Sequence, residues 1–184
     1  PRIGVRFRLP ASMNQVEYFG RGPAENYLDR NAGSMIGLYK STAEELYFPY
    51  VRPQENGHHT DTRWVSLSTG KKGLLIQADN TIGFNALRNS IEDFDDEEAT
   101  GLPRQWSNFT PEQVANHDEA AAKSVLRRQH HINDITPRDF VEVCVDLKQQ
   151  GVAGYDSWGS RPEPAYTLPA NREYNWGFTL IPLK

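Results

Sequence analysis

A recurring alternation of apolar and polar side chains is the feature that most restricts the fold of this chain. It is clearest at residues 140–148, where Val141, Val143, Val145 and Leu147 would share one side of an extended segment. Because successive side chains of a strand point to opposite faces of a sheet, this pattern predicts a strand with an apolar face in the core. Shorter or weaker strand patterns occupy residues 4–9, 15–19, 47–51, 62–68, 72–78, 83–87 and 174–180.

The spacing of these segments predicts an all-β fold. They are short and are separated by Gly, Pro, Asn and Asp, which is typical of antiparallel architectures. We expect residues 1–184 to form a single domain, a large two-layer antiparallel sandwich, because 184 residues suit one core. Thr110 and Pro111 form a helix start, and we place one short helix in an insertion at about 97–128.

The charge of the chain argues against two classes of partner. It has 24 acidic and 20 Lys and Arg residues, a formal net charge of -4, and so no electrostatic reason to bind nucleic acid or an anionic membrane surface. No apolar run approaches the length that crosses a bilayer. The sequence also lacks a phosphate-binding glycine motif, a nucleophile elbow and a Cys–His pattern. We therefore expect no nucleic-acid partner and no membrane partner.

The first of three polar loops covers residues 20–30, GRGPAENYLDR. Its glycines and proline favour a turn, and the side chains that follow are mostly polar or aromatic. A loop of this composition is often a binding site. A loop pinned by hydrogen bonds among its own groups is the alternative, and for any single residue it is the commoner case.

The second loop covers residues 53–61, PQENGHHTD, and raises the question of a metal site. On a strand, His59 and Asp61 would share a face while His58 points away, and no third ligand is near in the sequence. We therefore favour hydrogen-bonded loop histidines and predict no metal site in this chain. The acidic run at 92–98 is read as a solvated loop, with calcium as the lesser alternative.

The third loop covers residues 151–159, GVAGYDSWG. Trp158 stands at its far end, where it is not placed to fill the core of a sandwich. An exposed indole face suits stacking on the C–H face of a sugar ring, with nearby polar groups for the hydroxyls. The competing reading is that Trp158 fills a gap between loops. The residues alone leave both readings open.

Several sequence blocks, taken in order, resemble the C-terminal, small-chain-like domain of β-galactosidases of glycoside hydrolase family 2. The blocks are PRIG at 1–4, YFGRGPAENYLDR at 18–30, PYVRPQENG at 49–57 with TDTRW at 60–64, LKQQGV at 147–152 and YDSWG at 155–159. They extend over nearly the whole chain, which makes the resemblance far more specific than one short motif.

The resemblance implies a galactose-mutarotase-like supersandwich within a retaining enzyme that hydrolyses terminal β-D-galactosides such as lactose. It places the catalytic glutamates and the magnesium site on a preceding barrel domain. It therefore implies no catalytic residue and no cofactor on this chain. The magnesium and sodium ions of the whole enzyme are expected to bind mainly elsewhere. The implied partners are a β-galactoside sugar, that barrel domain and further copies in a homo-oligomer. The isolated domain is expected to be inactive.

The resemblance also assigns site residues. Trp158 matches a loop Trp that packs near the sugar on the leaving-group side, and Asp156 and Ser157 are expected to support it. Three further residues lie in matching blocks and are expected to shape the cleft: Glu55, Asn56 and Arg63.

Three other functions stay open at this point. One is a stand-alone aldose mutarotase-like enzyme, which would need an acid and a base positioned on opposite sides of a sugar ring. Another is a non-catalytic carbohydrate-binding module, and a third is the small subunit of a split β-galactosidase. Kinship of fold does not by itself transfer any of these activities.

Overall fold

The computed structural model describes residues 1–94, 131–156 and 158–184. The chain divides into two compact units. The first contains Pro1–Phe48, Asn56–Arg88 and Pro137–Lys184, and the second contains Pro49–Glu55 and Asn89–Thr136. The helix predicted at 97–128 lies outside the described residues.

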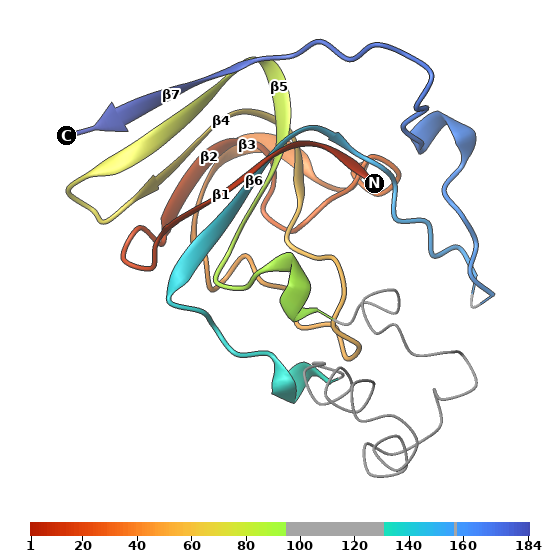
Figure 1. Ribbon diagram of the computed structural model, residues 1–184, viewed down its shortest axis with the longest axis horizontal. Helices are drawn as coiled ribbons and strands as arrows, with labels where there is room; N and C mark the ends of the chain where they lie inside the picture. Colours follow the sequence, from red (N-terminus) through yellow and green to blue (C-terminus); the bar gives the residue numbers. More distant parts are fainter. Residues whose placement is uncertain (95–130, 157) are drawn as a thin grey trace, which may run out of the picture. The chain divides into compact units, whose positions relative to one another are not determined.

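The first unit is built on one seven-stranded antiparallel sheet (Figure 1). Its strands run in the order β1-β6-β5-β4-β2-β3, and β7 pairs with β5. The strands are β1 (Arg2–Pro10), β2 (Gln15–Gly22), β3 (Met35–Thr42), β4 (His59–Ser68), β5 (Gly73–Leu87), β6 (Phe140–Gln149) and β7 (Phe178–Leu183). The predicted all-β antiparallel class is confirmed, and the arrangement is consistent with a β-sandwich.

The described helical elements are single 3-10 turns. The first unit carries η4 (Pro164–Tyr166), and the second carries η1 (Ile91–Asp93) and η3 (Ile132–Asp134). Within the described part of the chain, no helix has the length and apolarity that a membrane span requires.

Strand β5 divides the sheet. Residues Gly73 to Ala78 pair with β7, whereas Gly83 to Leu87 pair with β6, and β4 pairs with residues from both halves along the opposite edge. Figure 1 shows β5 bending sharply between its two halves. Because of this bend, one strand can pair with two neighbouring strands that run in different directions.

The core lies on one face of the curved sheet. Buried apolar side chains alternate along β2 and β4, with Val16, Val65 and Leu67 at 0–2% exposure. The ring of Tyr18 on β2 lies 5.1 Å from the ring of Phe84 on β5, although β4 separates these strands. The sheet therefore curves enough to bring the side chains of non-neighbouring strands together.

Strand β6 is buried on both faces. The apolar face predicted from the sequence is confirmed, but the opposite face, with Glu142 and Asp146, is also buried. Arginines of β1 pair with these acids: Arg8 Nε lies 3.0 Å from Glu142 Oε2, and Arg2 Nη1 lies 3.4 Å from Asp146 Oδ2. A carboxylate is stable in such a position when a cation and hydrogen-bond donors accompany it.

One strand prediction was wrong and one strand was missed, each for a physical reason, while the strand predicted at 174–180 begins only at Phe178. The segment 47–51 forms no strand; Pro49 and Pro53 have no backbone N–H to donate to a sheet, and Phe48 donates its N–H to Asn56 Oδ1 instead. Strand β3 was missed because Gly37 and the exposed Ile36 and Leu38 give no clear apolar face at this sheet edge.

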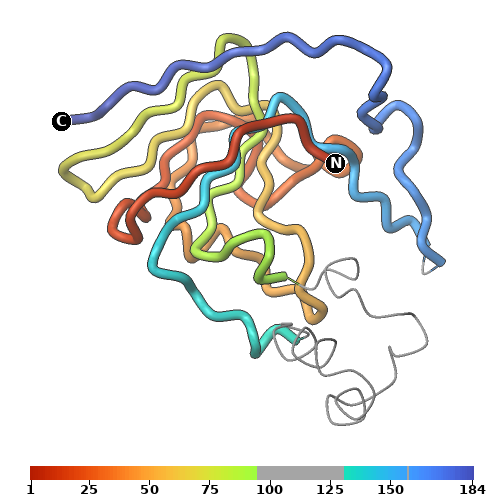
Figure 2. Tube along the Cα trace, in the orientation of Figure 1, coloured from red at the N-terminus to blue at the C-terminus, as the bar shows by residue number. Residues whose placement is uncertain are grey.

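A long excursion separates β6 from β7. In Figure 2 the blue part of the chain leaves the sheet after β6, runs without strand pairing and returns as β7. This excursion contains the loop with Trp158, so that loop is connected to the sheet through β6 at one end and β7 at the other.

Candidate functional site

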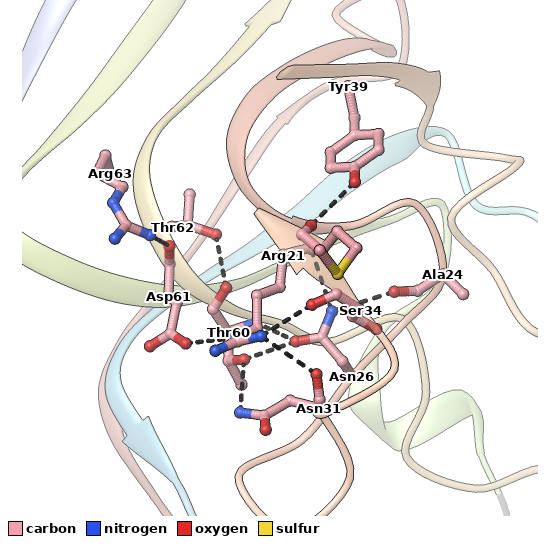
Figure 3. Close-up of polar contacts among 11 residues, drawn as sticks. Arg21, Ala24, Asn26, Asn31, Ser34, Tyr39, Thr60, Asp61, Thr62 and Arg63 are labelled. Atoms are coloured by element: carbon pink, nitrogen blue, oxygen red, sulfur yellow. Dashed lines mark hydrogen bonds and ion pairs between the residues drawn. The ribbon is translucent and has the colours of Figure 1, made fainter. Parts of the chain in front are cut away.

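Asn26 organises the loop between β2 and β3. Its side chain is fully buried, and its amide nitrogen donates to the carbonyl oxygens of Arg21 and Ala24, each at 3.1 Å. Its amide oxygen accepts from the backbone N–H of Thr60 at 2.9 Å and from the Thr60 hydroxyl at 2.6 Å. One amide thereby joins the loop to the start of β4, as Figure 3 shows.

Arg21 makes a second connection between the same segments (Figure 3). Its Nε lies 2.5 Å from Asp61 Oδ2, and its Nη1 donates to the carbonyl oxygens of Ser34 at 2.8 Å and Asn31 at 3.3 Å. Asp61 has a φ of 52°, in the left-handed region, within an irregular stretch of the β4–β5 pairing. The predicted strand geometry, in which His59 and Asp61 share a face, does not apply across this irregularity.

Glu25 ties the first loop to the second. Its Oε2 accepts from the Gly57 backbone N–H at 2.6 Å, and its Oε1 pairs with Arg30 Nη2 at 2.6 Å. Together with Asn26 and Arg21, this carboxylate holds the first loop by hydrogen bonds within it and by others to the second loop and the start of β4.

The two loop histidines are also hydrogen-bonded and buried, at 1% exposure each. His58 Nδ1 lies 2.8 Å from Asn85 Oδ1, while His59 contacts the carbonyl oxygens of Gly57 and Pro23. Burial lowers the pKa of His58 to about 3; the hydrogen bond to Asn85 opposes this shift, and the charges of Arg2 and His59 add to it. Because an amide oxygen only accepts, the neutral His58 ring carries its proton on Nδ1.

The described residues show no cluster of the carboxylate and imidazole ligands that a bound divalent cation would use. Magnesium and sodium need several converging oxygen ligands. Within residues 1–94, 131–156 and 158–184, no three His, Cys, Asp or Glu side chains gather in one place. We derive no step through a metal on this chain.

Trp158 projects from the third loop with 93% of its surface exposed. Asp156 Oδ1 accepts from the Trp158 backbone N–H at 2.8 Å and from the Ser160 N–H at 3.3 Å, and so closes a tight turn around it. Gly154 and Gly159 flank the turn with φ values of 84° and 82°, which favour glycine. Ser157 lies outside the described residues.

Within the described part of this chain, Trp158 does not fill a gap between loops. A side chain that fills a gap loses most of its exposed surface, whereas Trp158 retains 93% of it. The loop therefore presents an aromatic surface outward.

The base of this loop meets the first polar loop. Asp29 accepts hydrogen bonds from the backbone N–H groups of Val152 at 3.0 Å and Ala153 at 2.7 Å, and the Gly151 N–H donates to the Tyr166 carbonyl at 2.9 Å. A cavity of about 490 Å³ is lined by residues that include Asp29 and Tyr166. Its volume lies within the usual range for small-molecule sites.

The remaining predicted site residues lie on other segments. Asn56 is buried, and its carbonyl oxygen accepts from Asn85 Nδ2 at 2.7 Å. Arg63 is half-buried on β4, with its guanidinium carbon 5.7 Å from the Phe19 ring centre. Glu55 is half-buried and belongs to the second unit. The structure thus brings Asp156 close to Trp158, whereas Asn56 helps to hold its own loop.

Sequence reasoning missed the role of Asp29. The residues that it holds are 123 and 124 positions away, and local spacing carries no signal over such a separation. The signal in the sequence that could have indicated a role for Asp29 was its position in a strongly polar loop.

A family model described as β-galactosidase small chain matches residues 1–180 of this chain. The chain belongs to the β-galactosidase small chain family. The resemblance stated from the sequence blocks is confirmed, since the match covers all of the blocks quoted for it.

Curated relatives support the same assignment. The β-galactosidase of Priestia megaterium is 35% identical over 184 residues, which are 100% of this chain and 15% of the relative. That of an Arthrobacter species is 41% identical over 99 residues, 50% of this chain and 10% of the relative. That of Vibrio cholerae is 29% identical over 180 residues, 98% of this chain and 14% of the relative. The chain therefore spans only a small part of the length of these β-galactosidases.

Proposed function

We propose that this chain completes the sugar cleft of a larger retaining β-galactosidase, in which it supplies an aromatic contact through Trp158. The observation that carries the proposal is the 93% exposure of an indole on a loop that is capped by Asp156 and attached to the sheet domain through Asp29. A Trp face buries the C–H groups of a sugar ring and leaves the hydroxyls free for polar partners.

The described carboxylates near the loops support placing the bond-breaking chemistry elsewhere in the enzyme. Glycoside hydrolysis requires two carboxyl groups that flank the bond to be cleaved. Glu25 and Asp61 pair with arginines, and Asp29 and Asp156 accept backbone N–H groups. These four side chains are committed to holding loops, which fits a domain that binds rather than cleaves.

The proposal gives a structural role to some of the other predicted site residues, whereas the rest are supported by the resemblance alone. Asp156 would support Trp158 through the turn that it closes, and Asn56 would shape the cleft through the loop that it holds. Glu55, Arg63 and Ser157 remain predictions from the resemblance. The barrel domain, the magnesium and sodium ions and a homo-oligomeric assembly are likewise proposed for the whole enzyme and not for this chain alone.

Replacing Trp158 by Ala in the full-length enzyme that carries this chain tests the proposal. A retaining enzyme passes its sugar to water or to an acceptor sugar. We expect the acceptor concentration for half-maximal transfer to rise about tenfold, because an aromatic contact contributes about 0.5–1.5 kcal/mol beyond burial. Transfer and hydrolysis products are measured over a range of acceptor concentrations.

Two variants serve as controls for this measurement. Trp158→Phe keeps an aromatic face and should recover most of the affinity. Met35→Ala removes a large side chain that is 72% exposed on β3 and should leave transfer unchanged. Unchanged acceptor dependence in Trp158→Ala would refute the sugar contact.

The division of labour between domains has a separate test. The purified 184-residue chain is assayed with a chromogenic β-galactoside, alone and after mixing with the remainder of its enzyme. We expect no turnover by the chain alone and recovery of activity on mixing. Turnover by the chain alone, or anomer interconversion of free galactose, would instead favour an active site among its own carboxylates and histidines.

A further inference from the structure

The carboxylate of Asp29 binds the backbone at the start of the Trp158 loop in a two-point contact. Oδ1 accepts from the Val152 N–H at 3.0 Å, and Oδ2 accepts from the Ala153 N–H at 2.7 Å. Both acceptors are charged, so these hydrogen bonds are stronger than those between neutral groups. Two contacts from one planar group also fix the direction of the backbone and not only its distance.

The backbone on the other side of this contact is shaped to receive the carboxylate. A Cβ atom at residue 151 would stand 2.5 Å from Asp29 Oδ2, so only glycine permits the approach. Ala153 has a φ of 57°, in the left-handed region that non-glycine residues seldom adopt. Successive N–H groups turned toward one anion in this way form a backbone nest.

The contact is connected to Trp158 through a short, internally bonded segment. The Tyr155 N–H donates to Ser160 Oγ at 3.2 Å, and Asp156 closes the turn that contains Trp158. The Gly151 N–H donates to the Tyr166 carbonyl, which joins the two ends of residues 151–166. Because the ends of this segment are joined, the direction in which it projects depends on how its base is held.

We propose that Asp29 is the positioning residue for Trp158: its carboxylate fixes the base of residues 151–166 and thereby aims the indole at the sugar. The inference rests on the proposed function, because it needs Trp158 to contact sugar. Asp29 itself touches no reacting atom. Holding a functional group through a supporting contact is how sites keep the accuracy that binding needs.

The decisive experiment is a double-mutant cycle in the full-length enzyme that carries this chain. Asp29→Ala is expected to raise the acceptor concentration for half-maximal transfer about tenfold, as Trp158→Ala does. In a Trp158→Ala background, Asp29→Ala should add nothing, because the two residues act through one contact. Additive effects of the two substitutions would overturn the inference.

Further variants separate positioning from a general loss of structure. Gly151→Ala keeps Asp29 but pushes the loop away from it, so it should reproduce the Asp29→Ala effect. Asp29→Asn keeps one acceptor oxygen and should recover part of the affinity. Asp79→Ala removes the same charge from an exposed position on β5 and should leave transfer unchanged.

A second measurement tests the contact without any sugar. In the 184-residue chain, the Val152 and Ala153 N–H groups should exchange with solvent at least about tenfold faster in Asp29→Ala than in the wild type or Asp79→Ala. Unchanged exchange would overturn the inference at its first step.

The two proposals fail in different ways. If Trp158→Ala leaves transfer unchanged, the sugar contact is wrong and the positioning role falls with it, whatever the exchange rates show. If Trp158→Ala weakens transfer while Asp29→Ala and Gly151→Ala do not, the proposed function stands and only the role of Asp29 is refuted.

Discussion

Asn26→Ala should lower the free energy of unfolding by about 3 to 4 kcal/mol, because each buried group left without a partner costs about 1–3 kcal/mol. The substitution removes four hydrogen bonds at a fully buried position. It leaves the carbonyl oxygens of Arg21 and Ala24 and the N–H and hydroxyl of Thr60 without the amide that now satisfies them. Urea denaturation of the 184-residue chain measures the change as a lower midpoint at unchanged slope.

Two matched substitutions show whether this loss comes from the buried network. Asn175→Ala removes an exposed amide whose Nδ2 donates to Glu173 at 2.9 Å, and it should change stability by less than about 0.5 kcal/mol. Asn26→Asp keeps the two bonds from Thr60 but loses both donors, and it should still be strongly destabilising. Equal midpoints for Asn26→Ala and Asn175→Ala would contradict the role assigned to Asn26.

The second large effect is a loss of stability in acid that depends on His58. Burial lowers the pKa of His58 from 6.5 to about 3, with smaller lowering contributions from Arg2 and His59 and an opposing one from the hydrogen bond to Asn85. Between these two pH values, the His58 ring is therefore protonated in the unfolded chain but neutral in the folded chain. Above pH 6.5 the neutral His58 ring costs the fold no stability. As the pH falls from 6.5 toward 3, the free energy of unfolding decreases by up to about 1.4 kcal/mol for each pH unit.

His58→Asn should flatten this acid slope. The absolute stability of the variant falls because the ring stacked on Tyr27 is lost, so the informative quantity is the change of unfolding free energy with pH. Urea unfolding at several pH values between 6.5 and 4 gives that slope for each protein. His131→Asn, at an exposed position, is the matched control. A slope unchanged by His58→Asn would contradict a neutral buried ring.

His59 should act in the same direction. Burial also lowers its pKa, opposed by its contacts with the carbonyl oxygens of Pro23 and Gly57. Asp146 Oδ2 lies 3.9 Å from His58 Nδ1, but the Arg2 guanidinium pairs with the same carboxylate oxygen. The arginine offsets the negative charge that would otherwise favour a protonated His58.

One set of loop contacts supports both the stability of the chain and the proposed sugar contact. Asn26, Arg21 and Glu25 hold the loop between β2 and β3, and Asp29 of that loop holds the base of the Trp158 loop. Exposed binding groups are accurate only when the segments beneath them are fixed.

The sequence predicted the strands in which apolar and polar side chains alternate. Residues 140–148 and 62–68 lie within β6 and β4, and their alternation follows from the geometry of a strand. Residues 72–78 and 83–87 were predicted as separate strands, yet β5 continues from one to the other through Asp79 and Asn80. Its pairing partners on either side override the local preference of these two residues.

The sequence by itself determined the all-β antiparallel class, the family and the three polar loops, because periodicity, turn residues and ordered blocks are local properties of the chain. Only the tertiary structure decided that Asn26 joins the first loop to β4 and that Asp29 holds Val152 and Ala153. It also decided that His58 and His59 are buried. These contacts join residues far apart in the chain, and their partners are selected by the curvature and pairing of the sheet.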